Sequence, residues 1–528
     1  MDERVQALLD DVRRAQTLSG PDLLRAQRRA SWLAEFTAAQ FVQFLTALLK
    51  LDFPADGSLN GLLEPWLRAA VQGRKKWKRD SAEERDIARE IPSLAAEVYA
   101  GLGKSSKSRH HLLALLATGG TNVEVSSLVR LLVHDPPTGD SAVVQALAPL
   151  FQRRDLPVGE LFPALLEALE HPQLAAPVLD LANYLVREKR VERHPAADRV
   201  EHLSGLLGQI AQSLFSLVED RQAAGLSPVE LSRRVAGSVA LAVSLCDALA
   251  LIGDRRAVGK LYQAMALAHR RLRTEAAAAL ARLGEDEGAA ELVKLAAEPV
   301  ARLRVLAYAR ELGILDKIDP ALQTPRARAE AELAVWLAEP TQFGVPPVSM
   351  ELFDHRRQFW PGFTEPVECF LFRFTYAVTV EGEGERSLSN IGIAGPLAHA
   401  FLADLADLPP DDIYAAFAGW QAEHEEIREY DVERLSRSEK LEVQRLVRRL
   451  HDAGYANIEP LRMGYFFGGK ALVAGAERSG VGGIAVADFD EIAYFPRRHS
   501  RRPLGPAECY SIYKGRRLLK SFNPQGGP

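Results

Sequence analysis

The stretch Ala248–Asp254 (ALALIGD) decides the fold, because an alanine- and leucine-rich run ends there in glycine. The same ending returns at Leu283–Asp286 (LGED) and at Leu312-Gly313. The three glycines, at positions 253, 284 and 313, stand 31 and then 29 residues apart. Steps of this length are typical of stacked helical hairpins. The chain is therefore predicted to contain helical repeats.

Two earlier segments show the same organisation less clearly. Leu128–Pro136 (LVRLLVHDP) and Leu165–Pro172 (LLEALEHP) are each an apolar helical run stopped by His and Pro. Their prolines lie 36 residues apart, and a proline in the interior of a helix breaks it. We predict repeats from about residue 111 to 340, preceded by an irregular helical part over residues 1–110.

The helical pattern breaks near residue 340, where Glu339-Pro340 and Val345–Pro347 interrupt it. Beyond this point, Cys369–Val380 is rich in Phe, Tyr, Thr and Val, a composition typical of strands. Two helices are predicted over 411–429 and 438–453, and further strands over 387–393, 461–467, 471–476, 484–488, 492–495 and 509–513. The predicted fold is thus mainly α: a helical solenoid over residues 1–340, followed by an α+β domain over 341–528.

Length and composition restrict the class of protein. A chain of 528 residues exceeds the size of a single core, so at least two folded units are expected. Only 7% of residues are aromatic, which suits closely packed helices, and a net charge of −5 favours no class of partner. The three cysteines form no CxxC pair, so no disulfide, metal site or cofactor is predicted. Reduced thiols and a charged N-terminus unlike a signal peptide predict a cytoplasmic location.

One segment has the length of a membrane span. Val235–Ile252 is interrupted only by small residues and by Asp247. A carboxylate near the bilayer centre costs roughly 2.5 to 3.5 kcal/mol, and alanines return little of this. We therefore predict that the segment is a buried helix of the repeat region and that no membrane is bound.

Two of these segments carry a family resemblance. Ala248–Val258 (ALALIGDRRAV) and Arg273–Gly284 (RTEAAAALARLG) resemble short HEAT-like repeats of the phycobilisome-lyase type, most strongly over residues 241–313. The resemblance implies a HEAT-like α-solenoid, a curved stack of helix pairs that binds partners, usually proteins, along its concave face. It does not imply lyase chemistry, because the repeat is reused in many roles. We recognise no family for residues 341–528.

The predicted function is non-enzymatic: a scaffold for protein-protein interaction. A repeat surface is ordered before it binds, so a few anchors can supply the affinity. The candidate partner-binding residues are the inter-helix arginines Arg255, Arg256, Arg271 and Arg273. A structural role competes with this one, because these arginines could cap helices or pair with Glu275 and Glu285.

A basic tail raises the alternative of nucleic-acid binding. Tyrosines and a phenylalanine alternate with the cations, as in proteins that neutralise phosphates and stack on exposed bases. No recognised binding motif accompanies them, and the same patch could hold a protein partner or the acidic remainder of the chain. The candidate residues are Arg497, Arg498, Arg501, Arg502, Lys514, Arg516 and Arg517.

A second alternative makes the C-terminal domain a small enzyme or ligand-binding unit. It would require a polar pocket that joins His399, His424 and Asp407. These residues show no HExxH or other metal-ligand spacing, so no catalytic or metal-binding residue is assigned.

Two other features have structural rather than catalytic explanations. The glycines of 468–483 lack the helix that follows a phosphate-binding loop, so a hairpin that turns at Arg478–Gly480 is predicted there. Cys369 lies among phenylalanines in a predicted strand and is expected to be a buried, inert thiol.

Overall fold

The computed structural model divides into two compact units, Met1–Leu292 and Val293–Pro528. The division falls before residue 340, because the last two helices of the predicted solenoid, α18 (Pro299–Glu311) and α19 (Pro325–Leu337), belong to the second unit. The described residues are 2–15, 17–51, 59–74, 86–104, 106–119, 121–138, 142–219, 228–380, 384–395, 400–402, 405–422, 428–466, 469–497 and 503–524.

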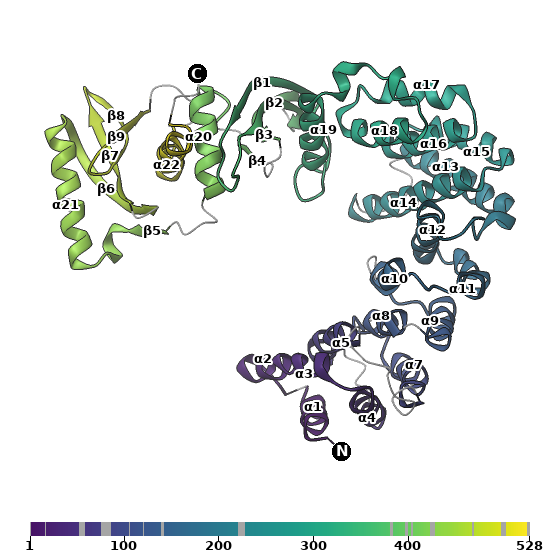
Figure 1. Ribbon diagram of the computed structural model, residues 1–528. Helices are drawn as coiled ribbons and strands as arrows, with labels where there is room; N and C mark the ends of the chain where they lie inside the picture. Colours follow the sequence, from purple (N-terminus) through teal and green to yellow (C-terminus); the bar gives the residue numbers. More distant parts are fainter. Residues whose placement is uncertain are drawn as a thin grey trace. The chain divides into compact units, whose positions relative to one another are not determined.

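In the described residues of the first unit, all regular secondary structure is helical, and turns and loops join the helices (Figure 1). Three short 3₁₀ segments, η1 (Leu166–Glu170), η2 (Ala197–Arg199) and η3 (Arg255–Ala257), link its α-helices, and α17 (Asp286–Leu295) crosses the division between the units. The other helices are α1 (Glu3–Arg13), α2 (Gly20–Arg28), α3 (Ala30–Glu35), α4 (Ala38–Leu48), α5 (Asn60–Arg74), α7 (Ile91–Gly101), α8 (Arg109–Gly119), α9 (Asn122–His134), α10 (Ala142–Gln152), α11 (Val158–Leu165), α12 (Pro172–Arg187), α13 (Val200–Glu219), α14 (Pro228–Ile252), α15 (Val258–Met265) and α16 (Arg270–Arg282).

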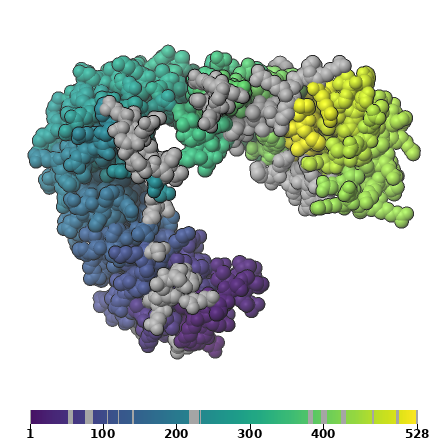
Figure 2. All heavy atoms as spheres, turned by 180° about the vertical axis from the view of Figure 1, so that it is seen from behind, coloured from purple at the N-terminus to yellow at the C-terminus, as the bar shows by residue number. Residues whose placement is uncertain are grey.

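The helices of the first unit stack in two rows. In one row, α8, α10, α12, α14 and α16 each pack on the helix before it, starting from α5. In the other row, α7, α9 and α11 follow α4 in the same way, and α13 packs on α15 further along. One hydrophobic core, which extends from Val5 to Leu283, fills the space between the rows. The described helices therefore form one continuous body, purple to teal in Figure 2.

Left-handed glycines end the helices of the recurring motif. Gly253 and Gly284 follow α14 and α16 with φ angles of 79° and 85°, and Gly313 follows α18 with φ of 69°. After Gly284, the amide of Glu285 donates to the carbonyl oxygen of Leu280 at 3.0 Å, as in a Schellman cap. Residues with a side chain rarely adopt this conformation. The recurring Leu-Gly in the sequence thus marks true helix ends.

The apolar segment 235–252 forms most of α14. Of the described helices, α14 contains the one window long and apolar enough to cross a membrane, Arg233–Ile252, and 56% of that window is buried in the structure. It packs on α12, α13 and α16. Its Asp247 forms an ion pair with Arg187 of α12, and Asn183 of α12 donates to the carbonyl oxygen of Ser244 at 3.0 Å. Asp247 and the Ser244 carbonyl group of α14 thus have their partners within the first unit.

The second unit combines helices with two antiparallel sheets, which confirms an α+β C-terminal region in a mainly helical protein. The strand orders are β1-β2-β3-β4 and β5-β6-β7-β8-β9. Besides α18, α19 and the 3₁₀ segments η4 (Leu315–Lys317), η5 (Pro320–Gln323) and η7 (Val432–Arg434), the elements are β1 (Ser349–Gln358), β2 (Val367–Val380), β3 (Gly384–Ala394), β4 (Ala400–Leu402), α20 (Pro410–Gln421), β5 (Arg428–Asp431), α21 (Arg437–Asp452), β6 (Tyr455–Phe466), β7 (Gly469–Arg478), β8 (Val481–Ala487), β9 (Ile492–Pro496) and α22 (Pro506–Phe522).

Helices cover both faces of the first sheet. Leu333 and Leu337 of α19 pack with Phe372 and Phe374 on one face. On the other face, Leu371 joins a core that contains α20 and α22. Because successive residues of a strand point to opposite faces, the near-continuous apolar run of β2 is buried on both sides.

The second sheet is covered in the same way. Val473 and Val486 pack with α20 and α22 in the shared central core. The opposite face, which includes Leu472, packs with Leu446 and Leu450 of α21. The layers of the second unit are therefore α19, the first sheet, the pair α20 and α22, the second sheet, and α21 (Figure 1).

The same order of elements occurs twice in this unit. A helix, four antiparallel strands and a helix run from α19 to α20, and again from α21 to α22. The closing helices begin with related sequences, PDDIYAAFAG at 410–419 and PAECYSIYKG at 506–515, which share proline, an acid, tyrosine, an aromatic residue and glycine at equal spacing. The second unit is thus built from two copies of one topology that meet at α20 and α22.

One predicted strand is wrong, because residues 509–513 belong to α22. Their run of Cys, Tyr, Ser, Ile and Tyr imitates a strand, since a helix enclosed between two sheets is apolar on most sides. The predicted hairpin is confirmed: Ser479 and Gly480, both with positive φ, join β7 to β8. The first predicted helix extends too far, because α20 ends at Gln421 and residues 428 and 429 belong to β5. Residues 423–427 of that prediction lie outside the described residues.

Candidate interaction surface

Two of the predicted partner-binding arginines form ion pairs within the first unit. Arg255 pairs with Glu285 and donates to the carbonyl oxygen of Leu283 at 3.1 Å, so it caps the end of α16. Arg256 binds Asp254 and Glu201, the latter at 2.8 Å. The guanidinium groups stay accessible, with 69% and 60% of the side chains exposed.

The other two arginines differ from each other. Arg273 pairs with Glu291, which is mostly buried, whereas Arg271 lies exposed at the start of α16. The structural role that the sequence left open, pairing with Glu285, is therefore present for Arg255. The four arginines do not form one cluster of uncommitted charge, because three of them neutralise acids of their own unit.

Where the structure describes the basic tail, most of its candidate cations are buried or bound to acids of the second unit. Lys514 is fully buried, Arg516 donates to Asp412 of α20 at 2.9 Å, and Arg517 forms an ion pair with Asp488. Arg497 is exposed at the end of β9. The remaining members of the predicted patch, Arg498, Arg501 and Arg502, lie outside the described residues. Much of the described basic charge therefore stabilises the fold.

The structure describes one of the three residues that the enzymatic alternative requires. Asp407 is exposed, and His399 and His424 lie outside the described residues. Among the residues that the structure places, no group of three or more His, Cys, Asp or Glu could hold a metal ion.

The three cysteines have the properties of structural thiols. Cys246, Cys369 and Cys509 are all buried. Burial raises the pKa of Cys369 and of Cys509 to about 12, and it raises the pKa of Cys246 well above its usual range. A thiol with a raised pKa forms little thiolate, the reactive species. The predicted burial of Cys369 is confirmed.

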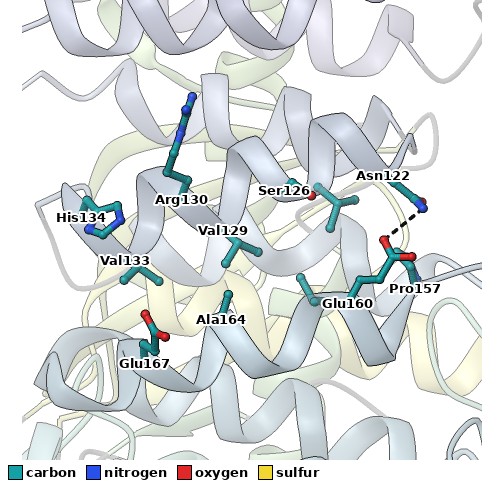
Figure 3. Close-up of a pocket in the computed structure, with 12 residues that line it drawn as sticks. Asn122, Ser126, Val129, Arg130, Val133, His134, Pro157, Glu160, Ala164 and Glu167 are labelled. Carbon is teal, nitrogen blue, oxygen red and sulfur yellow. Dashed lines mark hydrogen bonds between the residues drawn. The ribbon is translucent and has the colours of Figure 1, made fainter.

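A groove lies between α9 and α11 in the second row of the first unit (Figure 3). Its volume is about 190 Å³, and its floor consists of the buried side chains of Val125, Val129 and Leu161. Along α9, four polar residues spaced by one helical turn form the rim: Asn122, Ser126, Arg130 and His134. Because an apolar floor with a polar rim is typical of interaction sites, this groove is a candidate docking surface.

The sequence fixes the start of α9 locally. Thr121 and Glu124 form a capping box, in which the amide of Thr121 donates to Glu124 Oε2 at 2.9 Å. The same carboxylate pairs with Arg74 of α5, and both side chains are buried. The helix that carries one wall of the groove is therefore anchored to its neighbours.

The opposite wall, formed by α11 and η1, is acidic. Glu160 and Glu167 line the groove beside Ala164. Asn122 Nδ2 of α9 donates to Glu160 Oε2 at 3.1 Å, which holds this carboxylate at the rim. Figure 3 shows the side chain of Arg130 turned away from α11. The groove thus combines apolar and anionic surface.

A second groove lies between α13 and α15, further along the same row. It has a volume of about 550 Å³, and Gly205 and Gly208 of α13 face Lys260 and Gln263 of α15. A methyl group on Gly208 would come within 2.9 Å of the flexible end of the Lys260 side chain, so the two helices are close here. Phe215, with 55% of its surface exposed, lines one end.

Sequence reasoning missed both grooves, because they depend on which faces of distant helices meet. One signal could have indicated the acidic wall. Between Arg154 and Arg187 the chain contains no Lys or Arg but five acids, Asp155, Glu160, Glu167, Glu170 and Asp180.

Comparisons with family models, with curated proteins and with solved structures found no match to this chain. The resemblance to HEAT-like repeats therefore stays a prediction, and the candidate site is defined by its own geometry.

Proposed function

We propose that the protein is a non-enzymatic scaffold that binds partner proteins along a solenoid of HEAT-like repeats. The two rows of stacked helices in the first unit support the solenoid, together with the left-handed glycines that end the recurring helices. In such an array each helix pair contacts its neighbours, so the surface is long and ordered before binding. This suits recognition of a macromolecule in the cytoplasm.

The observation that carries this proposal is the pair of grooves between successive helices of one row. The α9–α11 and α13–α15 grooves both expose apolar surface bordered by polar side chains. Arg255 and Arg256 lie in η3, which leads directly into α15, so they would flank a partner in the second groove. We therefore assign these arginines a secondary role, as charged contacts at the rim.

Site-specific photo-cross-linking of the full chain tests the proposal. A photoreactive amino acid replaces Ser126 or Gln212, one in each groove, and the protein is irradiated in an extract of its source cells. Gln152 and Gln173, exposed on α10 and α12 of the other row, are the matched controls. We expect a discrete protein adduct at a groove position that nuclease does not remove. Equal adducts at all four positions, none at all, or loss with nuclease would contradict the scaffold.

A further inference from the structure

Two carboxylates, Glu160 and Glu167, line the α11–η1 wall of the α9–α11 groove, whereas Arg130 and His134 stand on the α9 wall. Residues 155–186 contain five acids and no Lys or Arg, an excess of five negative charges. Three of the five acids contact other residues: Asp155 pairs with Arg153, Asp180 accepts a hydrogen bond from Ser244, and Glu170 lies 3.9 Å from His202. A local field of this kind attracts cations and repels anions, most strongly at low ionic strength.

Two of these carboxylates are positioned for an external cation. Glu160 and Glu167 line the groove, and in the part of the chain that the structure describes neither forms an ion pair. Glu160 accepts a neutral hydrogen bond from Asn122 at 3.1 Å, which orients it without cancelling its charge. A partner that supplies cations at this wall would therefore complete two ion pairs.

The spacing of the two carboxylates defines the partner further. Glu160 lies in α11 and Glu167 lies seven positions later in η1, a step of roughly 10 to 12 Å along the helix axis. A helical partner presents side chains at this separation at positions i and i+7, and its positions i+3 and i+4 lie between them on the same face. Aliphatic side chains there would meet the floor of Val129 and Leu161.

The size of the groove favours a side chain over a whole drug-sized ligand. A volume of about 190 Å³ is smaller than the roughly 300 to 1,000 Å³ of small-molecule sites. It has room for the tip of an aliphatic side chain while the rest of the ligand stays outside. Nucleic acid is disfavoured as well, because its phosphates would face the carboxylates of Glu160 and Glu167.

We propose that the α9–α11 groove binds a basic amphipathic helix of a partner protein. Its aliphatic residues at i+3 and i+4 cover the floor, and Lys or Arg at i and i+7 pair with Glu160 and Glu167. The proposal rests on the scaffold function and specifies the chemistry of one of its docking sites.

Binding of a synthetic peptide to the full-length protein tests this chemistry. The probe is a fluorescent alanine-based helix with Lys at i and i+7 and Leu at i+3 and i+4, and its affinity is measured by anisotropy. Two further peptides replace both Lys by Glu, or both Leu by Ala. We expect the Lys–Leu peptide to bind more tightly than either, with an affinity that falls as salt is raised.

Variants of the protein locate the binding. In Glu160→Gln/Glu167→Gln we expect Kd to rise about five- to tenfold, which corresponds to about 1 to 1.4 kcal/mol for the two exposed ion pairs together. Ala164→Arg, an exposed position in the groove, should abolish binding by filling it. The controls are Glu188→Gln/Glu192→Gln and Ala148→Arg, all exposed outside the groove. Circular dichroism checks that each variant is folded.

The outcomes are separable from those of the scaffold test. Absence of binding, equal affinity for the Glu peptide, or unchanged affinity in the groove variants would each overturn the basic-helix proposal. Cross-linking from Gln212 or Ser126 to a partner would still support the scaffold in that case. Loss of cross-linking at both grooves would remove the scaffold itself.

Discussion

Gly515 of α22 lies so close to Ala415 of α20 that a methyl group on Gly515 would overlap the carbonyl oxygen of Ala415. Gly419 of α20 has the same relationship to the carbonyl oxygen of Ser511. Ala415 and Ser511 occupy corresponding positions of the two related helix sequences, as do the two glycines. The contact is therefore reciprocal, as in a two-fold symmetric pair, and it lies at the centre of the second unit.

Replacing either glycine should separate these helices. We expect Gly515→Ala and Gly419→Ala each to lower the free energy of unfolding by about 3 kcal/mol, because the added carbon has only backbone to displace. Hydrogen exchange followed by mass spectrometry would report the loss of protection in α20 and α22.

A third glycine provides the control for this experiment. Gly237 in α14 is exposed, and no atom lies within 4 Å of the position of an added methyl group. Alanine is the better helix former, so Gly237→Ala should stabilise the protein by about 0.5–1 kcal/mol. Equal effects at Gly237 and Gly515 would show that close packing at Gly515 is unimportant.

The sequence predicts individual elements of the second unit better than their arrangement. The strands over 369–380, 471–476 and 484–488 are confirmed, because β-branched and aromatic residues describe a pleated, buried surface well. Residues 509–513 were placed in a strand because composition cannot distinguish a buried helix from a buried strand over a short run. The enclosure that makes α22 apolar is a tertiary property.

Arg302 holds α18 to α19 through buried contacts. It forms an ion pair with Glu330 at 2.6 Å and donates to the carbonyl oxygens of Ala296 and Ala327 at 3.0 and 2.7 Å. Arg302→Met removes these bonds and leaves the Glu330 carboxylate without this cation, so we expect a loss of about 3 kcal/mol in urea denaturation. Arg328→Met, which breaks an exposed pair with Glu332, should cost less than about 0.5 kcal/mol. Similar losses in both variants would contradict the prediction.

His194 should make the first unit sensitive to acid. The amide of Ala196 donates to His194 Nδ1 at 3.1 Å, so the ring is neutral and Nε2 carries the hydrogen that faces Asn183 Oδ1 at 3.0 Å. Burial lowers the pKa of His194 from 6.5 to about 4. The unfolded chain therefore binds one more proton than the folded chain between these values, and about 3 kcal/mol of stability is lost as the pH falls from 6.5 to 4.

The measurement is the denaturation midpoint as a function of pH. Below pH 6.5 the unfolded state of the wild type binds up to one proton more than the folded state because of His194. In His194→Gln this difference should be smaller by about one proton, whatever the effect of the substitution on stability at neutral pH. A wild-type slope in His194→Gln would mean that His194 does not titrate with unfolding.

The cysteines test the absence of thiol chemistry in the native state. Because burial raises the pKa of Cys369 and Cys509 to about 12, neither should react with a thiol reagent at pH 8 while the protein is folded. Denaturation should expose these two thiols and Cys246, which together are the three cysteines of the chain. Rapid modification of one thiol in the native protein would instead indicate an activated nucleophile.

The candidate site was less predictable than the fold. Arginines next to glycine-terminated helices suggested a partner surface, but Arg255 and Arg273 pair with acids that lie 30 and 18 residues further along the chain. Such pairs form only when helices stack, so the sequence shows the charge without its partner. The grooves were missed for a related reason, since Val129 and Leu161 become one floor only through the contact of α9 with α11.

The left-handed glycines test whether the repeat pattern stabilises the fold. Gly284 has φ of 85° and open space around the position of a methyl group, so alanine there would suffer backbone strain but no clash. We expect Gly284→Ala to cost about 1 kcal/mol and Gly284→Asn less, because asparagine tolerates this conformation better. Gly288→Ala, four residues later, should cost more, since its methyl group would lie 2.6 Å from the amide nitrogen of Ala281. In thermal unfolding we therefore expect the midpoint temperature to fall most in Gly288→Ala, less in Gly284→Ala and least in Gly284→Asn, an order that separates packing from backbone strain. Equal effects of Ala and Asn at position 284 would contradict a left-handed helix end.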